Sequence, residues 1–439
     1  MMKYLILLLV FTFQFSQAQI LSERERAILK DNLLEDRFTN LLPQLMDAAD
    51  IDMWLLISRE YNEDPVLKTM LPATWLNARR RTIIVFYRDK AKNTLERLAV
   101  ARYDIGKNIK SAWDKEKEPD QWKALSEIIK NRNPNKIGVN ISKYFALADG
   151  LVKTDYDELL ENLPKSYVNK VVSAEKLAIG WIETRTAKEM KLYKELVQIT
   201  HNIIADTFSS KTIIPGKTTT EDLVWYLRQK VTDLGLETWF HPTIDIQRNN
   251  EVLKSHIESF SKGKEKKIIL KGDLLHCDFG ITYIGLNTDC QQHAYVLKDN
   301  ENSVPTFLVD AFKKGNRVQD ILTSNMKVGK TGNQILKESL IQGRKEGLVP
   351  SIYTHPLGMY GHSAGTTIGM WDSQNGVPVN GDYPLHKNTV YAIELNTTVA
   401  LKEWNKNIRI MLEEAGFFGN NIFEYVNSRQ TEIIPIKIK

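Results

Sequence analysis

Residues 274–296, LLHCDFGITYIGLNTDCQQHAYV, contain the pattern that decides the fold of the second half of this chain. Two runs of apolar and β-branched residues flank TYIG, which predicts a buried β-hairpin. With the turn at TYIG, Asp278 lies opposite Asp289 on one face, and Cys277 lies opposite Cys290 on the other. The two thiols are then either free or joined in a disulfide. The two carboxylates repel each other unless a cation lies between them, one is protonated, or the pair is exposed.

Further acids interrupt predicted strands. Glu394 lies within TVYAIELNTT, and Glu413 or Glu414 interrupts NIRIMLEE. Burial disfavours a carboxylate among β-branched residues, so these acids indicate a site. His362, in the glycine-rich loop GHSAGTTIG, adds an imidazole, and His276 shares the face of the first hairpin Asp, either in the core or behind a site. Two Asp, two Glu and one His suit a pair of divalent ions such as Mn²⁺ or Co²⁺ better than thiolate-bound zinc.

The same loop contains GHSAG, which also fits the G-x-S-x-G pattern of a nucleophilic serine at Ser363. That pattern requires a buried strand before the serine and a helix after it. Here Pro356 and two glycines come before it, while β-branched residues and more glycines follow. The sequence therefore favours His362 over Ser363 as the residue of this loop that takes part in chemistry.

The length of 439 residues predicts two domains. Helices alternate with strands over residues 25–175, which is typical of a compact α/β domain. After a boundary near Ile182, amphipathic helices and the hairpin predict an α+β domain, an antiparallel sheet covered by helices. We thus expect a signal segment at 1–18, a smaller α/β domain at 19–182 and a catalytic domain at 183–439.

The first residues, MMKYLILLLVFTFQFSQAQ, combine one Lys with an apolar run of about a dozen residues and the triplet SQA. This pattern predicts a secretory signal cleaved after Ala18, although an uncleaved anchor is an alternative. The formal net charge is +5, and basic residues are interspersed with acidic ones. That distribution predicts neither a nucleic-acid partner nor a membrane surface. We expect a soluble exported protein, periplasmic or extracellular.

The order of the candidate residues resembles the pita-bread metallopeptidases. The common pattern is D-x-G, an Asp eleven residues after the first, a Gly-flanked His, and one Glu on each of two late strands. That superfamily includes Xaa-Pro aminopeptidase, prolidase, methionine aminopeptidase and the metal-free creatinase. The resemblance covers the whole second domain, and the α/β domain before it is similar to that of the creatinase branch. It implies a creatinase-like domain followed by a pita-bread domain.

The resemblance implies five metal ligands that would hold two divalent cations, with manganese favoured and cobalt or zinc as alternatives. These ligands are Asp278, Asp289, His362, Glu394 and Glu413. Glu413 is preferred because the last ligand of the family is followed by a second acid. The implied mechanism uses a hydroxide that bridges the metals, with Glu394 as the proton acceptor and His256 or His355 stabilising the oxyanion.

The implied function is that of a homodimeric Xaa-Pro aminopeptidase or prolidase-like peptidase acting on peptides with a penultimate proline. Several outer positions depart from the family. Gln291 and Gln292 stand where Thr and Arg are usual, Met411 stands where an Arg is usual, and residues 371–372 replace a later His. Two alternatives therefore remain: a metal-dependent hydrolase of a non-peptide amide or ester, and a catalytically silent binding protein.

Overall fold

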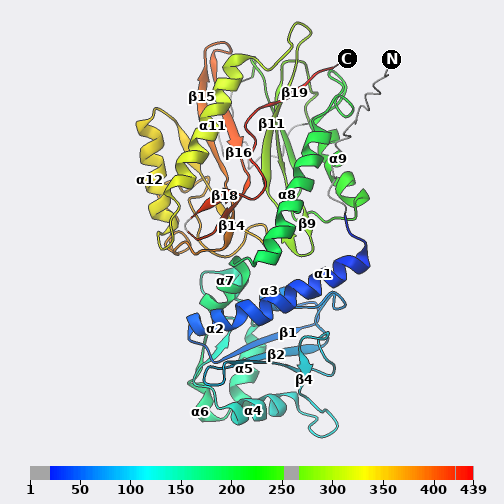
Figure 1. Cartoon of the computed structure of the whole chain (residues 1–439), viewed down its shortest axis with the longest axis vertical. Helices are drawn as coiled ribbons and strands as arrows, with labels where there is room; N and C mark the ends of the chain where they lie inside the picture. The colour runs from blue at the N-terminus through cyan, green and yellow to red at the C-terminus, as the bar shows by residue number, and fades with distance from the viewer. Residues whose placement is uncertain (1–19, 252–265, 421, 439) are drawn as a thin grey trace, which may run out of the picture.

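The computed structural model describes residues 20–251, 266–420 and 422–438. Within them the chain forms two lobes stacked along the long axis, with the amino-terminal lobe at the bottom of Figure 1. Helices and sheets are mixed in both lobes, as the sequence predicts. The expected signal segment, residues 1–18, lies outside the described residues, and so does His256.

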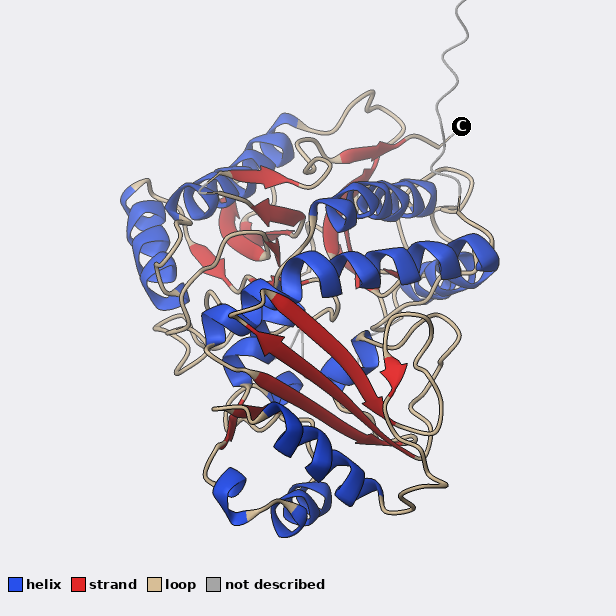
Figure 2. Cartoon of the chain, turned by 60° about the horizontal axis from the view of Figure 1, so that its bottom comes forward, coloured by secondary structure: helices blue, strands red, loops and turns tan. Residues whose placement is uncertain are grey.

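A six-stranded sheet in the order β4-β3-β2-β1-β5-β6 forms the centre of the amino-terminal lobe. Its strands are β1 (Met53–Arg59), β2 (Arg81–Asp89), β3 (Thr94–Val100), β4 (Lys110–Ser111), β5 (Ile137–Val139) and β6 (Val171–Ser173). Its helices are α1 (Glu23–Asp36), η1 (Arg37–Leu41), α2 (Leu42–Ala49), α3 (Pro65–Thr69), α4 (Gln121–Arg132), η2 (Ala146–Ala148), α5 (Lys153–Asn162), α6 (Lys165–Val168) and α7 (Glu175–Glu183). Helices cover both faces of the sheet (Figure 2). Trp54 and Leu56 therefore enter one core cluster, while Met53 and Leu55 enter another.

The carboxy-terminal lobe contains antiparallel sheets covered by helices. Its helices are α8 (Ala187–Thr207), α9 (Thr220–Asp233), α11 (Thr306–Asn325) and α12 (Gly332–Lys345). The longer sheets follow the orders β19-β11-β8-β7, β12-β15-β16 and β13-β14-β17-β18, and β9 pairs with β10. Their strands are β7 (Thr243–Gln247), β8 (Leu274–Phe279), β9 (Thr282–Tyr283), β10 (Leu286–Asn287), β11 (Cys290–Val296), β12 (Pro350–Ile352), β13 (His355–Leu357), β14 (Thr389–Ala392), β15 (Leu395–Leu401), β16 (Lys406–Leu412), β17 (Ala415–Phe418), β18 (Phe423–Tyr425) and β19 (Ile434–Ile436). The pairing of β11 with β19 is parallel, and the others are antiparallel.

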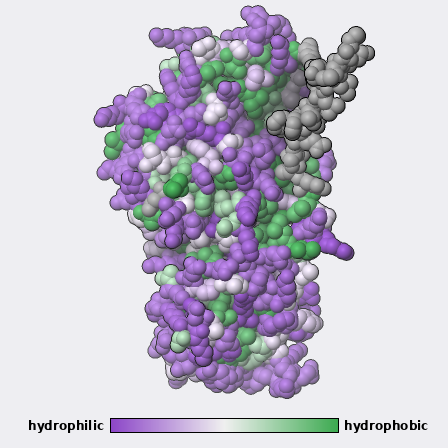
Figure 3. All heavy atoms as spheres, in the orientation of Figure 1, coloured by the Kyte–Doolittle hydropathy of each residue, from purple (hydrophilic) through white to green (hydrophobic). Residues whose placement is uncertain are grey.

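The surface agrees with the mixed charge distribution of the sequence. Hydrophilic residues cover most of the face in Figure 3, and hydrophobic residues occur there in scattered groups. Among the helices of the described residues, none has the length and apolar character needed to span a bilayer.

The register of the hairpin differs from the predicted one. In the structure Asp278 lies opposite Gln291, and Cys277 lies opposite Gln292, two positions further along than expected. The reason is the turn, which consists of Ile284 and Gly285 alone, with φ of 52° and 77°. Positive φ at both residues is the type I′ geometry of two-residue hairpins. The predicted opposition of Asp278 to Asp289, and of the two cysteines to each other, is therefore wrong, and both cysteines are buried thiols that form no disulfide.

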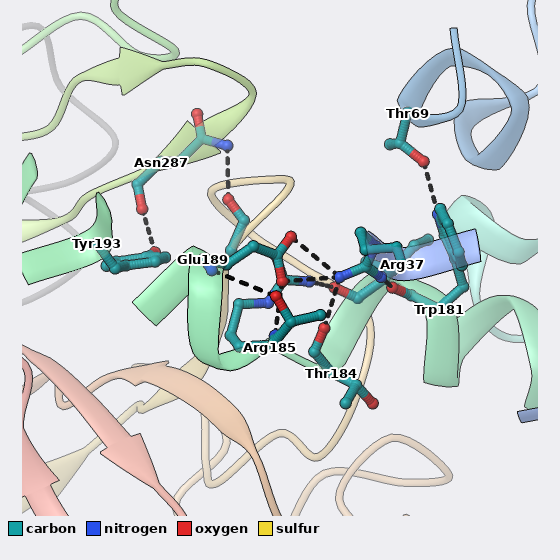
Figure 4. Close-up of polar contacts among 11 residues, drawn as sticks. Arg37, Thr69, Trp181, Thr184, Arg185, Glu189, Tyr193 and Asn287 are labelled. Carbon is teal, nitrogen blue, oxygen red and sulfur yellow. Dashed lines mark hydrogen bonds and ion pairs between the residues drawn. The ribbon is translucent and has the colours of Figure 1, made fainter. Parts of the chain in front are cut away.

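A buried polar network joins the two lobes where α7 leads into α8 (Figure 4). The domain boundary predicted near Ile182 falls within α7. Arg37 in η1 donates to both carboxylate oxygens of Glu189 in α8, at 3.0 and 2.9 Å, and also to the carbonyl of Trp181. The lobes are thus connected by a buried ion pair as well as by the chain.

Candidate metal centre

Four side chains predicted to belong to the site converge inside the carboxy-terminal lobe. Asp289 precedes β11, His355 begins β13, Glu394 lies between β14 and β15, and Glu413 lies between β16 and β17. The Nε2 atom of His355 lies 3.7 Å from Asp289 Oδ2, 3.9 Å from Glu394 Oε2 and 3.5 Å from Glu413 Oε1. Ligand atoms of Asp289, His355 and Glu413 all lie within 4.8 Å of one another. Segments distant in sequence therefore direct nitrogen and oxygen donors to one point.

Sheet register explains why the two glutamates meet. Leu395 pairs with Leu412 in one ladder, and Ala392 pairs with Ala415 in the next. Glu394 and Glu413 lie where both ladders are interrupted, and the continuous register places them opposite each other. Opposed like charges destabilise a sheet unless something compensates them. A repulsion between like charges, of the kind expected within the hairpin, thus also arises between these later strands.

Three of the nitrogen and oxygen atoms in this group that could bind a metal are buried. They have no hydrogen-bond partner within the described part of the chain. They are Asp289 Oδ1, His355 Nε2 and Glu413 Oε1. Burial, followed by the charges of neighbouring carboxylates, raises the pKa of Asp289, Glu394 and Glu413 well above the ordinary range. Burial lowers the pKa of His355. Buried acids beside a neutral imidazole, with donor atoms left unpaired, fit a divalent cation.

Asp278 approaches this group from β8. Its side chain is half-buried, and its negative charge contributes to the raised pKa values of Asp289, Glu394 and Glu413. It therefore adds a fourth carboxylate to the three around His355, so that each carboxylate ligand expected from the sequence lies in one region.

The two loop histidines lie differently from the sequence prediction, which took His362 as the ligand. His355 faces the carboxylates because β13 pairs with β14, the strand that leads into Glu394. The ring centroid of His362 lies 4.7 Å from that of His355 and 5.3 Å from that of Trp239. Flanking glycines favoured His362 in the sequence, whereas the neighbouring strand is what positions His355.

Gln291 is a component of the site that the sequence marked only as a departure from the family. Its Nε2 donates to Glu394 Oε1 at 2.6 Å and to Glu413 Oε2 at 2.8 Å. Its Oε1 lies 2.9 Å from Nε2 of His276, which is buried. His276 thus lies behind the cluster of acids, one of the two predicted possibilities. A polar residue two positions after Asp289 was the available signal for Gln291.

A second group of potential ligands lies next to the first. It consists of His201, Cys290 and Glu414. Nε2 of His201 lies 2.6 Å from Glu414 Oε2, and Gln292 donates to Glu414 Oε1 at 3.0 Å. Burial raises the pKa of the Cys290 thiol well above its ordinary value. Both Glu414 oxygens therefore have partners, unlike Oε1 of the preceding glutamate.

A cavity of about 740 Å³ lies at the junction of the lobes. Its apolar and aromatic wall includes Leu33 from α1 and Trp239, Phe240 and Met359 from the carboxy-terminal lobe. His362 also lines this cavity. The ring that adjoins His355 is therefore accessible from a space large enough for a short peptide.

Comparisons with known proteins agree with this geometry. The sequence model of metallopeptidase family M24 matches residues 191–415, slightly more than half of the chain and all five proposed metal-binding positions. A search of curated proteins gave no match.

Solved structures show the same fold at low sequence identity. An X-Pro aminopeptidase from Thermotoga maritima MSB8 is 15% identical with a TM-score of 0.62, and the match covers 90% of this chain and 100% of that one. A Xaa-Pro dipeptidase from Bacillus anthracis is 14% identical with a TM-score of 0.55, covering 93% and 100%. The N-terminal domain of the FACT complex subunit SPT16 from Cicer arietinum is 11% identical with a TM-score of 0.53, covering 94% and 98%. The family match over half of the sequence, together with this fold, establishes that the chain belongs to metallopeptidase family M24, in the pita-bread superfamily.

Proposed function

We propose that the chain is a metal-dependent peptidase of the Xaa-Pro aminopeptidase or prolidase type. The observation that carries the proposal is the convergence of Asp289, His355 and Glu413, each with a buried nitrogen or oxygen atom that has no described hydrogen-bond partner. Membership of family M24 supports a hydrolase that uses divalent cations. Structural likeness to an X-Pro aminopeptidase and a Xaa-Pro dipeptidase supports substrates with a penultimate proline.

The proposed ligands for up to two divalent cations, with manganese favoured, come from five segments. They are Asp278, Asp289, His355, Glu394 and Glu413. His355 thereby takes the ligand role that the sequence assigned to His362, because its Nε2 faces the carboxylates. When bound, the cations would supply Lewis acidity and lower the pKa of a water molecule.

The remaining roles follow from the positions of the side chains. Glu394 is held through Oε1 by Gln291, so its Oε2, which faces the centre, is the oxygen placed to accept a proton. His362 lies on the cavity wall beside His355, where its ring can donate to the carbonyl oxygen of a substrate. The apolar wall around Trp239 would receive the side chains of a short peptide. A role for His256 stays a prediction from the sequence.

A second candidate is the hydrolysis of a non-peptide amide or ester at the same centre. The observation that favours it is the replacement of positions expected to recognise peptide termini. Met411 stands where an Arg is expected, and its backbone N–H donates to Nε2 of His293 at 3.0 Å. Gln292 is similarly committed to Glu414. Neither residue is placed to bind the carboxylate of a peptide.

The test is a panel of X-Pro dipeptides, longer X-Pro peptides, and simple amides and esters, assayed with metal-stripped protein before and after addition of Mn²⁺. We expect Mn²⁺-dependent cleavage of the X-Pro bond. We also expect His355→Ala to lose at least about 100-fold in kcat/KM, because a direct ligand matters more than its outer partners. Cleavage restricted to the amides or esters would favour the second candidate. Absence of both metal binding and hydrolysis would support a silent binding protein instead.

A further inference from the structure

The cavity at the junction of the lobes receives positive charge from the amino-terminal lobe. Its wall of about 740 Å³ includes Lys30 from α1, Arg37 from η1 and Lys68 from α3. Figure 1 shows α1 along the side of this lobe that adjoins the carboxy-terminal lobe. Among the described lining residues, the acids are Glu189 and Glu237. Three cations thus face two carboxylates, a balance that favours an anionic occupant.

These charges differ in whether they already have partners. Arg37 donates to both carboxylate oxygens of Glu189, so this buried pair is neutralised internally. The ammonium groups of Lys30 and Lys68, in contrast, form no hydrogen bond or ion pair with any residue that the structure describes. The positive charge available to a ligand in this cavity therefore comes from the two lysines.

Lys30 is the more confined of the two lysines. Its side chain is half-buried, whereas that of Lys68 is exposed. Burial lowers the pKa of Lys30, and the negative charges of Asp31 and Glu237 oppose this change. An ammonium group that is partly withdrawn from water and lacks a partner is unfavourable. A carboxylate bound beside Lys30 would supply that partner.

Another part of the same wall comes from the carboxy-terminal lobe and adjoins the candidate metal centre. It includes Trp239, Phe240 and His362. The ring centroid of His362 lies 4.7 Å from that of His355, which faces the cluster of acids. A short peptide whose carbonyl group approaches His362 would therefore share one cavity with the two lysines. The aromatic rings can contact its side chains, and Lys30 can bind a carboxylate.

We propose that Lys30, assisted by Lys68, forms a subsite for a carboxylate group of the substrate, so that the amino-terminal lobe takes part in substrate selection. The carboxylate is either the carboxy terminus of a short peptide or an acidic side chain that follows the proline. The inference rests on the proposed function, because it presumes that X-Pro peptides occupy this cavity. It also provides a partner for a carboxylate that Met411 and Gln292 are not placed to bind.

The test compares four peptides by calorimetric titration of the metal-stripped full-length chain, so that cleavage does not compete with binding. Ala-Pro has a terminal carboxylate that Ala-Pro amide lacks. Ala-Pro-Glu amide has a side-chain carboxylate that Ala-Pro-Gln amide lacks. We expect one or both acids to bind at least about 10-fold more tightly than the matched neutral peptide, as for a hydrogen bond between charged groups. The acid that shows this preference identifies the source of the carboxylate.

Variants of the lysines connect the preference to the subsite. Lys30→Met removes the charge and keeps the apolar stem, so it should lower the preference by about 10-fold and leave the binding of the neutral peptides unchanged. Lys30→Gln should do the same if the Met variant does not fold. Lys30→Arg keeps the charge and should keep the preference. Lys68→Met should have a smaller effect, because water and salt screen an exposed charge.

Lys123→Met is the matched control, because Lys123 is an exposed lysine of α4 that does not line the cavity. In Figure 1, α4 lies at the end of the amino-terminal lobe far from the junction. This control should keep the preference. No difference between the acids and their neutral partners, with or without measurable binding, would overturn the inference. A preference that survives both Lys30→Met and Lys30→Gln, or that falls equally in the control, would also overturn it. A preference for the acids without any Mn²⁺-dependent cleavage of the peptides would overturn the proposed function alone.

Discussion

At the scale of single residues, Glu413 and Glu414 are adjacent in sequence but serve different surroundings. Oε1 of Glu413 has no described hydrogen-bond partner beside His355, whereas both oxygens of Glu414 have hydrogen-bond partners, among them His201 and Gln292. Consecutive residues near a strand point to opposite faces, which separates the two acids. The proposed metal chemistry therefore depends on Glu413 and the local stability on Glu414.

This separation gives a prediction for the two glutamine variants. Glu413→Gln should lose cation retention on gel filtration, because it removes a direct ligand charge. Glu414→Gln should retain the cation but unfold at a lower temperature, because a partly buried His201 loses its anion, a change of about 3 kcal/mol in the free energy of unfolding. Metal analysis and thermal unfolding measure the two effects. Loss of the cation in Glu414→Gln alone would reverse the assignment.

A second prediction concerns Glu183, which is buried at the end of α7. Burial raises its pKa from the ordinary 4.5 to about 8, and its Oε2 has no described hydrogen-bond partner. The folded chain then keeps a proton that the unfolded chain releases near pH 4.5. The stabilising contribution is complete below pH 4.5 and is lost as the pH rises to about 8. Melting temperatures should fall over that range, and less steeply in Glu183→Gln; parallel curves for the two proteins would contradict the shift.

The residue types of the candidate site could be predicted from the sequence, but their exact assignment could not. Acids inside apolar strands identified Glu394 and the pair Glu413 and Glu414, because burial of an uncompensated carboxylate is unfavourable, and the family resemblance chose Glu413 from that pair. The sequence could not rank His355 against His362, since the choice depends on pairing between β13 and β14. The contacts of Gln291 likewise depend on a register that only the turn geometry fixes.

At the scale of elements, the hairpin shows how one turn determines a site. The sequence predicted both strands correctly from their β-branched and aromatic residues. It treated TYIG as the turn, whereas the actual loop is Ile284 and Gly285. A β-branched residue at positive φ is uncommon, so Ile284 gave no signal for this geometry. The resulting shift brings Gln291, not Asp289, opposite Asp278.

This turn can be tested by Gly285→Ala. A Cβ at Gly285 would meet nothing within 4 Å, so any effect comes from its φ of +77° alone. We expect a loss of about 1 kcal/mol in the free energy of unfolding, the cost of a left-handed conformation for a residue other than glycine. Denaturant unfolding measures it. Unchanged stability would argue against the type I′ turn and therefore against the register.

At the scale of the whole molecule, the alternation of helices and strands predicted the mixed fold, but the contact between the lobes could not be predicted. Arg37 and Glu189 lie 152 positions apart, and neither belongs to a recognisable motif. Their pairing depends on how α7 and α8 place the lobes (Figure 4). Both residues also line the cavity that has His362 in its wall, so the junction shapes the proposed substrate space.

The last prediction compares the two ways of breaking this junction. Arg185 lies 3.4 Å from Glu189, so Arg37→Met leaves the carboxylate with one cationic partner, whereas Glu189→Gln leaves two buried guanidinium groups without an anion. Removing one partner of a buried pair costs about 3 to 5 kcal/mol, and we expect Glu189→Gln to fall at the upper end and Arg37→Met below it. Calorimetric melting temperatures give the order.

Because neither residue contacts the ligand cluster through a described bond, Mn²⁺ affinity should stay within about 2-fold of the unmodified chain while KM rises. An equal loss of stability in the two variants would mean that Arg185 does not share the charge of Glu189. A parallel loss of Mn²⁺ affinity would mean that the junction directly supports the proposed metal centre.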